Sequence, residues 1–327
     1  MKIAIIGAGL AGLGVVHGLL DLGVPGSQIT VYDAAGVGAG ASGAAAGIVH
    51  PYAGARARKN WRGDEAMAAS QNLIERAEAT APGEVIRARG ILRIALSERQ
   101  TATFSSCAQE YPDVTSWNAA QCTKAAPGLV DAPGIFIERG MGIDIRRYLQ
   151  VLWEMAHAKG CHLEIQAVAA VAELQDYDRI VVAAGMASVA IHECAQLPLH
   201  AVKGQLLELV WPKELPPLRY ALNSVGYVLQ HRPDRCLVGS TFEHAFKDEA
   251  PNLELAKAEI LPKIAAFLPD LGRAEVVGCT AGLRASTPNH LPLAQKVGDK
   301  TWILTGLGSK GLLYHALLGS EIAAQLC

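Results

Sequence analysis

The stretch IAIIGAGLAG at residues 3–12, together with ITVYD at residues 29–33, decides the fold of this chain. The two pieces predict a strand, a glycine-rich turn, a helix and a second strand that ends in an acidic residue. In such a unit Gly7 permits the tight turn, Gly9 lets the backbone approach a pyrophosphate, and Gly12 lets the helix pack closely on the strand. The start of the helix directs N–H groups and its positive dipole end at the phosphates. The final aspartate lies 21 residues after Gly12 and can accept hydrogen bonds from a ribose. The pattern therefore predicts a dinucleotide site.

Other interpretations of residues 3–20 are open. A glycine-rich turn between a strand and a helix can bind nothing. The same residues, mostly apolar and preceded by the lone charge of Lys2, could also form the apolar part of a secretory signal or a membrane span. The glycines and alanines at fingerprint spacing, and the lack of a positively charged flank, favour the strand–turn–helix interpretation. We therefore expect no membrane association.

Composition indicates a globular protein. The chain has 327 residues, of which 50% are hydrophobic and 18% charged, and its formal net charge is -2. This balance gives no overall electrostatic reason to bind nucleic acid or an acidic membrane. The seven cysteines are widely spaced, odd in number and include no Cys-x-x-Cys pair. We therefore expect reduced thiols and a cytoplasmic location, with no metal site and no disulfide framework.

Helical and extended patterns alternate along the rest of the chain. The run at 178–185 is apolar on both faces and ends in glycine, as in a buried parallel strand. Residues 127–142 predict mostly loop, with one short strand at 135–137. Further strands are predicted at 90–96, 161–165, 206–210, 226–230, 236–239 and 301–305, and helices at 61–80, from 98, at 145–159, 253–268 and 312–326.

A run of small residues follows the second strand. Thirteen of the fifteen residues after Asp33 are Ala, Gly or Ser. So many small side chains cannot fill a core, so we expect a loop that lies flat against something large. A flexible linker is the alternative, and it is weakened by the apolar residues from Ile48 onward.

These patterns predict an α/β fold with an α+β second domain. Helix–strand alternation occurs at the start, the middle and the end of the chain, and short strands of antiparallel type lie between. We expect a discontinuous Rossmann-like domain from 1–84, 141–200 and 278–327. An inserted antiparallel-sheet domain, which would face the substrate, is expected from 85–140 and 201–277.

In this order, the motifs resemble the D-amino-acid oxidase superfamily of FAD-dependent oxidoreductases, the group that includes glycine oxidase and sarcosine oxidase. Within it, the chain is similar to the oxidoreductase half of the bifunctional enzymes that complete the methylaminomethyl-thiouridine base of tRNA, although it contains no counterpart of their methyltransferase half. The family motifs are residues 7–12, 40–43, 178–185, 202–205, 239–243, 282–284 with Pro288 and Pro292, and 306–311. The similarity to the tRNA enzymes rests on residues 40–43 leading to His50-Pro51, on 289–292 and on 306–312.

The resemblance implies non-covalent FAD. Some members of the superfamily bind their flavin covalently through a cysteine or histidine. Cys279 is close in sequence to Arg284, but nothing beyond this position supports a bond from its thiol to the flavin. Several implied contacts are equally explained by tight turns that bind nothing. The implied FAD contacts are Gly7, Gly9 and Gly12 at the pyrophosphate, Asp33 at the ribose, Ser42 and Gly43 at phosphate or ribityl oxygens, Gly47 to His50 along the isoalloxazine, Val168 at the adenine, Ala184 and Gly185 beside the dinucleotide, and Gly308, Ser309, Lys310 and Gly311 at the flavin pyrimidine edge.

Four residues are candidates for catalysis. Arg284 would pair with an amino-acid carboxylate through its planar fork, and Tyr227 could donate its hydroxyl to the same group. Lys310 would stabilise negative charge on the reduced flavin, and His50 could contact substrate or flavin. Each has a structural alternative: an ion pair for Arg284, a core aromatic for Tyr227, a solvated loop lysine for Lys310 and local structure for His50.

These assignments lead to one main hypothesis. The protein would oxidise the C–N bond of a small amino acid or secondary amine by hydride transfer to flavin N5, and the resulting imine would hydrolyse. Oxygen or another electron acceptor would reoxidise the flavin. The alternatives are removal of a carboxymethyl group from a modified wobble uridine of tRNA, a flavin-holding electron-transfer subunit, and a nicotinamide dehydrogenase. The basic run at 56–62 could contact RNA phosphates or be a solvated loop.

Overall fold

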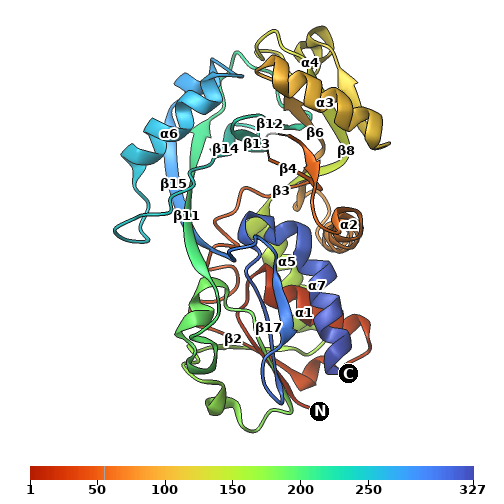
Figure 1. Ribbon diagram of the computed structural model, residues 1–327, viewed down its shortest axis with the longest axis vertical. Helices are drawn as coiled ribbons and strands as arrows, with labels where there is room; N and C mark the ends of the chain where they lie inside the picture. Colours follow the sequence, from red (N-terminus) through yellow and green to blue (C-terminus); the bar gives the residue numbers. More distant parts are fainter. Residues whose placement is uncertain (55) are drawn as a thin grey trace.

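The computed structural model describes residues 1–54 and 56–327. Figure 1 shows two stacked parts, with both termini at the end of the lower one. The helices are α1 (Leu10–Asp21), α2 (Gly63–Thr80), α3 (Glu98–Glu110), α4 (Ala119–Ala125), α5 (Ile145–Ala158), α6 (Leu253–Ala265) and α7 (Gly311–Leu326). The strands are β1 (Ile3–Ile6), β2 (Ile29–Asp33), β3 (Ile48–Val49), β4 (Tyr52–Ala53), β5 (Arg58–Lys59), β6 (Ile86–Ile94), β7 (Val114–Trp117), β8 (Gly134–Ile143), β9 (His162–Ile165), β10 (Arg179–Val182), β11 (His200–Val210), β12 (Ala221–Asn223), β13 (Tyr227–Arg232), β14 (Arg235–Gly239), β15 (Val276–Ser286), β16 (Leu293–Lys296) and β17 (Thr301–Thr305).

The lower part is built on a six-stranded sheet in the order β16-β17-β10-β1-β2-β9. The five strands from β17 to β9 pair in parallel, and β16 joins β17 antiparallel. All four residues of β1 are buried, because this strand lies inside the sheet with layers on both faces. The predicted α/β fold is confirmed, and sequence segments far apart in the chain supply its neighbouring strands.

Helices α1 and α7 cross at glycine contacts. A Cβ on Gly14 would lie 2.1 Å from the carbonyl oxygen of His315, and a Cβ on Gly319 would lie 2.3 Å from the carbonyl carbon of Gly14. The two backbones therefore touch, and any side chain at either position would push the helices apart. This contact joins the first helix to the last (Figure 1).

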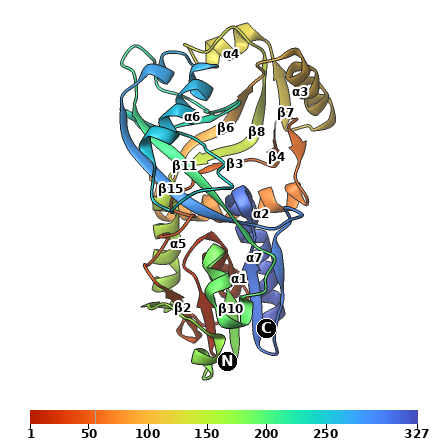
Figure 2. The same ribbon diagram turned by 60° about the vertical axis from the view of Figure 1, so that its left-hand side comes forward.

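The upper part is a nine-stranded sheet in the order β15-β11-β14-β13-β12-β6-β8-β3, with β7 paired to β8. Its pairings are antiparallel except for the parallel pair of β12 and β6. Helix α6 packs on β11 and β14 over a second apolar core. The strands β11 and β15 run side by side from this sheet towards the lower part (Figure 2).

Two parts of this sheet differ from the prediction. The loop predicted at 127–142 ends in β8, a ten-residue strand that pairs with β6, β7 and β3. Strand β15 was not predicted at all, because its sequence VVGCTAGLRAS is rich in small residues and lacks a clear alternation. Long-range pairing with β11 stabilises it, which local pattern does not reveal.

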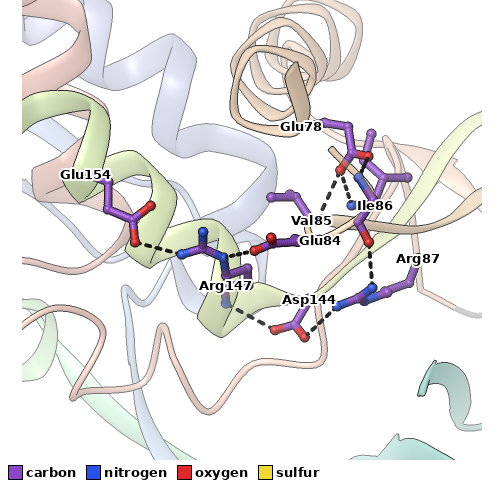
Figure 3. Close-up of polar contacts among 9 residues, drawn as sticks. Glu78, Glu84, Val85, Ile86, Arg87, Asp144, Arg147 and Glu154 are labelled. Atoms are coloured by element: carbon purple, nitrogen blue, oxygen red, sulfur yellow. Dashed lines mark hydrogen bonds and ion pairs between the residues drawn. The ribbon is translucent and has the colours of Figure 1, made fainter. Parts of the chain in front are cut away.

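A polar network holds the junction between α2, β6 and α5 (Figure 3). The Glu78 carboxylate accepts hydrogen bonds from three backbone N–H groups of the turn at 83–86. Arg87 on β6 reaches Asp144, which caps α5 by accepting from the Arg147 N–H at 3.1 Å. The Arg147 guanidinium pairs with two glutamates, Glu84 and Glu154. The network ties the start of the upper sheet to a helix of the lower part.

Further expectations can be compared with the structure. All seven cysteines are free thiols; five are buried, Cys279 is half-buried and Cys327 is exposed. No helix in residues 1–54 and 56–327 is long and apolar enough to cross a membrane. The strands of the six-stranded sheet all fall in the segments predicted for the Rossmann-like domain. The same predicted segments also contain β3 and residues 278–286 of β15, although both strands belong to the upper sheet. The domain boundaries themselves stay a prediction.

Candidate cofactor and substrate site

The predicted cofactor residues gather at one edge of the six-stranded sheet. Residues Gly7, Ala184 and Gly306 each follow the carboxyl end of a parallel strand, and these strands are neighbours. Gly7 lies against the next loop, since a Cβ there would be 2.4 Å from the carbonyl oxygen of Ala183. A Cβ on Gly12 would be 1.8 Å from the carbonyl oxygen of Gly7, so the helix can approach the strand only with glycine there. This edge is where open α/β sheets bind ligands.

Asp33 is fixed at the tip of β2. One carboxylate oxygen accepts from the N–H of Ala8 at 2.8 Å, and the other accepts from the N–H groups of Ala35 and Gly36 at 3.0 and 2.9 Å. An ionised carboxylate has about four acceptor positions, so ribose hydroxyls could still bind. Asp33 therefore orders the glycine turn and keeps acceptor capacity.

The small-residue segment is a packed loop over the start of α1. The Ser42 hydroxyl oxygen accepts from the N–H of Leu10 at 3.0 Å, and Gly38 donates its N–H to the carbonyl oxygen of Ala8 at 3.0 Å. Gly43 lies against Gly38, because a Cβ on Gly43 would be 2.2 Å from the carbonyl oxygen of Gly38. The arrangement matches the loop expectation rather than the linker.

These residues fit FAD. The first turn of α1 holds no acidic side chain, and its N-cap Gly9 offers no side-chain acceptor, so the positive end of the helix suits a pyrophosphate. Gly185 has a positive φ of 58° and no atom within 4 Å of a Cβ position, which leaves open space beside β10. Val168 is buried just beyond β9, next to β2, on the side expected for the adenine.

One strand connects the cofactor edge with the upper sheet. On β15, alternate residues share a face. Gly282 packs against the small-residue loop, since a Cβ would lie 3.0 Å from Ala41 Cα. Arg284 enters a polar cluster of the upper sheet, and Ser286 lies 3.3 Å from the Cβ position of Gly308. Gly282, Arg284 and Ser286 thus bring both predicted FAD loops and the predicted substrate arginine together.

The Arg284 guanidinium is held but not neutralised. It donates to the carbonyl oxygen of Thr241 and to the hydroxyl of Ser240, both at 3.2 Å, and its Cζ lies 4.5 Å from the centre of the Phe242 ring. Its other side meets the backbone of Gly204, where a Cβ would be 2.0 Å from Nη2. No carboxylate pairs with it within the described residues, so the structural ion pair is not formed. Burial lowers the pKa of Arg284, which stays a cation.

Tyr227 lies beside this arginine. Its hydroxyl would be 2.5 Å from a Cβ on Gly239, the residue opposite it on β14. Burial raises the pKa of the Tyr227 phenol to about 12, with the Arg284 charge acting in the opposite direction. The hydroxyl therefore stays protonated and can donate to an anion next to Arg284.

His50 is a neutral donor in this arrangement. Burial, and then the charge of Arg93, lower its pKa to about 3. The N–H of Tyr52 donates to Nδ1 at 3.2 Å, so the proton of the neutral ring is on Nε2. Nε2 lies 3.4 Å from Nδ2 of Asn223. A proton on Nε2 therefore requires the Asn223 amide in its flipped orientation, with the oxygen towards His50. His50 therefore has no free lone pair with which to accept a substrate proton.

Lys310 and its loop lie at the start of α7. The ammonium donates to the carbonyl oxygen of His290 at 3.1 Å, and burial lowers its pKa. Gly308 has a positive φ of 55°. Lys310 is tied to the turn at 287–291, and the half-burial of its side chain disfavours a freely solvated lysine.

Several residues of this cluster escaped the sequence reasoning. Asn223, Ser240 and Phe242 contact the candidate residues but have no spacing signal of their own. The signal that could have identified them is the presence of two motifs, 202–205 and 239–243, because these segments contact each other in the structure. Their side chains form a network in which Gln205 and Thr241 both bind Glu243, at 2.8 and 2.6 Å.

Comparison with known proteins decides the family. Residues 2–325 match the profile described as DAO, FAD dependent oxidoreductase. The chain belongs to this family. The resemblance seen in the motifs is confirmed, and the protein is an FAD-dependent oxidoreductase of the DAO family. Non-covalent attachment stays a prediction; the Cys279 thiol lies on the opposite face of β15 from Arg284 and contacts Gln205 at 3.7 Å.

Curated relatives of this DAO-family chain include proteins named for tRNA modification and a glycine oxidase. The protein of Caulobacter vibrioides called tRNA 5-methylaminomethyl-2-thiouridine biosynthesis bifunctional protein MnmC is 30% identical over 99% of this chain, and the one from Maricaulis maris is 27% identical over 99%. The chain covers 54% and 52% of those two proteins, about half their length. Glycine oxidase of Pseudomonas aeruginosa is 25% identical, over 95% of this chain and 91% of its own.

Solved structures agree on the fold. Glycine oxidase from Geobacillus kaustophilus superposes with a TM-score of 0.83 at 19% identity, covering 99% of this chain and 94% of its own. Iminodiacetate oxidase from Chelativorans sp. BNC1 gives 0.80 at 22% identity, with 99% and 94% covered. At these identities the likeness confirms the DAO-family fold alone.

Proposed function

We propose that this DAO-family protein oxidises the C–N bond of an amine that carries a carboxylate one carbon away, as in N–CH2–COO⁻ of a small amino acid or secondary amine. The observation that carries the proposal is the position of Arg284. A half-buried cation without a carboxylate partner among the described residues lies on the strand that also contacts both predicted FAD loops. Desolvation of a cation disfavours its charged form, and an anion bound next to Arg284 would offset this cost.

The chain's own residues account for recognition of the carboxylate. An arginine has five N–H donors, and Arg284 uses two of them on Thr241 and Ser240. Donors that remain can pair with a carboxylate, and the protonated Tyr227 hydroxyl adds a further donor. We assign Arg284 and Tyr227 as the anchors of the substrate carboxylate.

The same residues define what the site does not supply. Arg284 and Tyr227 both hold their protons, and the Nδ1 lone pair of His50 is used by a backbone N–H. None of these three side chains can therefore remove a proton from the substrate, so we expect the amine to enter in its neutral form. FAD, when bound, supplies the two-electron oxidant; the imine product then takes up water and separates into an amine and a carbonyl compound.

The test is anaerobic mixing of the holoprotein with glycine, sarcosine and a panel of D-amino acids. Decrease of the flavin absorbance with at least one of them is the expected result, and the rate should rise with pH as the amine loses its proton. If every compound leaves the flavin oxidised, oxidation of small amines is wrong.

A second candidate follows from the curated relatives. Proteins named for tRNA 5-methylaminomethyl-2-thiouridine biosynthesis align with 99% of this chain, so a carboxymethylaminomethyl group on tRNA is the alternative substrate. It presents the same N–CH2–COO⁻ unit to Arg284. Reduction of the flavin by modified tRNA, and not by free amines, would favour this function. The reduction by tRNA should weaken as the salt concentration rises, because phosphate contacts are screened.

A further inference from the structure

Arg93 on β6 is a buried arginine without a carboxylate partner. The residue is 3% exposed, and no ion pair between the described residues includes it. Burial lowers the pKa of Arg93 to about 10, so the guanidinium keeps its charge at neutral pH. Its Nε is buried and has no hydrogen-bond partner among residues 1–54 and 56–327. Burying a cation in this way is unfavourable, and the contacts that it does make indicate what it holds.

The guanidinium of Arg93 holds the backbone that follows His50. Nη1 donates to the carbonyl oxygen of Tyr52 at 3.1 Å, and Nη2 donates to the carbonyl oxygen of Gly54 at 2.7 Å. The centre of the buried Phe104 ring lies 5.1 Å from Cζ and covers the guanidinium. Strand β4, which contains Tyr52, pairs with β5 in a two-stranded sheet of its own. Arg93 therefore attaches this hairpin to β6 of the upper sheet.

Two neighbouring strands hold His50. Asn223 on β12 is the register partner of Arg93 on β6, so the two side chains lie on the same face of the sheet. Asn223 Nδ2 lies 3.4 Å from Nε2 of His50. Tyr52, whose carbonyl oxygen Arg93 binds, donates its N–H to Nδ1 of His50 at 3.2 Å. Both imidazole nitrogens are thus engaged, one by Asn223 and the other through Tyr52, and these contacts set which nitrogen carries the proton.

We propose that Arg93 is a positioning residue for the oxidation: it holds the Tyr52 peptide so that His50 keeps one orientation and one tautomer beside the flavin. The inference rests on the proposed function and on the predicted course of Gly47 to His50 along the isoalloxazine. Strand β3 attaches the start of this segment to β8, and Arg93 attaches the residues that follow it. Without Arg93 the segment, and the flavin ring that it would contact, can shift relative to the substrate.

The tautomer of His50 is the first test. It is measured on the holoprotein by NMR of 15N-labelled histidine rings, with His50→Gln to assign the signal. We expect the Nε2–H form alone in the parent protein. Arg93→Met keeps an unbranched side chain but removes the charge and both hydrogen bonds, so the Nδ1–H form should appear beside the first. The Nδ1–H form as the main species of the parent would overturn the proposal, whether or not the variant folds.

The second test separates the rate of flavin reduction from amine affinity, by anaerobic stopped-flow with the best amine of the panel. Arg284 donates to Thr241 and Ser240, so Arg93 takes no part in anchoring the carboxylate. Arg93→Met should lower the limiting rate about 10- to 100-fold and change the apparent Kd by about twofold at most. Arg93→Lys keeps a charge and one donor group and should recover part of the rate. Arg89→Met, at an exposed position of the same strand, is the control and should match the parent.

The outcomes separate this role from the proposed function. An unchanged limiting rate in Arg93→Met, a loss of affinity as large as the loss of rate, or a single Nε2–H tautomer in that variant would overturn the positioning role. If the tautomer changes as expected but no amine reduces the flavin of the parent, the hold of Arg93 on His50 stands and the proposed oxidation is refuted.

Discussion

Gly204→Ala should disable substrate binding while leaving the fold and the cofactor intact. The added Cβ would lie 2.0, 2.2 and 2.6 Å from Nη2, Cζ and Nη1 of Arg284, whereas real Cβ contacts are essentially never under 3.0 Å. The guanidinium must therefore move by at least about 1 Å, and its 3.2 Å hydrogen bonds to Thr241 and Ser240 would be lost or rearranged. A misplacement of this size at a positioning residue lowers kcat/KM by about 100-fold.

Because the displaced atoms are the end of a flexible side chain, the cost to stability should be small. We expect the thermal midpoint to stay within about 4 °C of the parent and the FAD content to be unchanged. The assay is kcat/KM for the best amine of the panel, with Gly298→Ala as the matched control, since a Cβ there meets nothing closer than 3.4 Å. Unchanged kcat/KM in Gly204→Ala would refute the role of Arg284, and loss of FAD would show that the two sites are not separable.

Three further results are expected. Tyr227→Phe should raise KM about tenfold, because one hydrogen bond to a charged carboxylate is lost, and the FAD content should change little. An unchanged KM in steady-state assays would show that Tyr227 does not bind the substrate. Burial lowers the pKa of His315 to about 4 from 6.5, so the unfolded chain binds the proton more tightly and the free energy of unfolding should fall as pH drops from 6.5 to 4. Denaturant titrations should show this loss, and a variant without the imidazole, His315→Gln, should show a smaller pH slope. Gly14→Ala should lower the free energy of unfolding by about 1–3 kcal/mol, because the Cβ would lie 2.1 Å from a carbonyl oxygen of α7; an unaltered denaturation midpoint would contradict the close helix crossing.

The cofactor half of the fold could be predicted because local pattern and tertiary role coincide there. Gly7 and Gly12 appear in the sequence at the spacing that the β1–α1 contact requires, and the apolar run at 178–185 becomes the strand next to β1. The helices predicted from 98 and at 145–159 follow Ser97 and Asp144, and both side chains accept the hydrogen bonds of N-caps. Short-range physics sets each of these features.

The upper sheet was predicted less completely. Strand β15 contains Gly278, Gly282 and several small residues, so nothing local marks it as extended, yet it carries Arg284. Small residues are present because β15 passes close to the loop at 41–44, a contact between segments more than 230 positions apart. The local sequence pattern does not indicate contacts between segments so far apart in the chain.

The substrate cluster shows the same limit. The resemblance placed Arg284 and Tyr227 in one site, but it could not show that Phe242 covers the guanidinium or that Gly204 must lack a side chain. It named His50 as a candidate without its tautomer, which depends on a backbone N–H two residues later. Contacts between side chains of different strands have no signature in a single sequence.

The central claim is that the protein removes two electrons from an N–CH2–COO⁻ unit held by Arg284. Its most direct measurement is the yield of glyoxylate in a single anaerobic turnover with sarcosine or N-benzylglycine. We expect one glyoxylate for each flavin reduced, and in Arg284→Gln both the glyoxylate yield and the extent of flavin reduction should fall. Reduction of the flavin without glyoxylate, or equal reduction in Arg284→Gln, would contradict it.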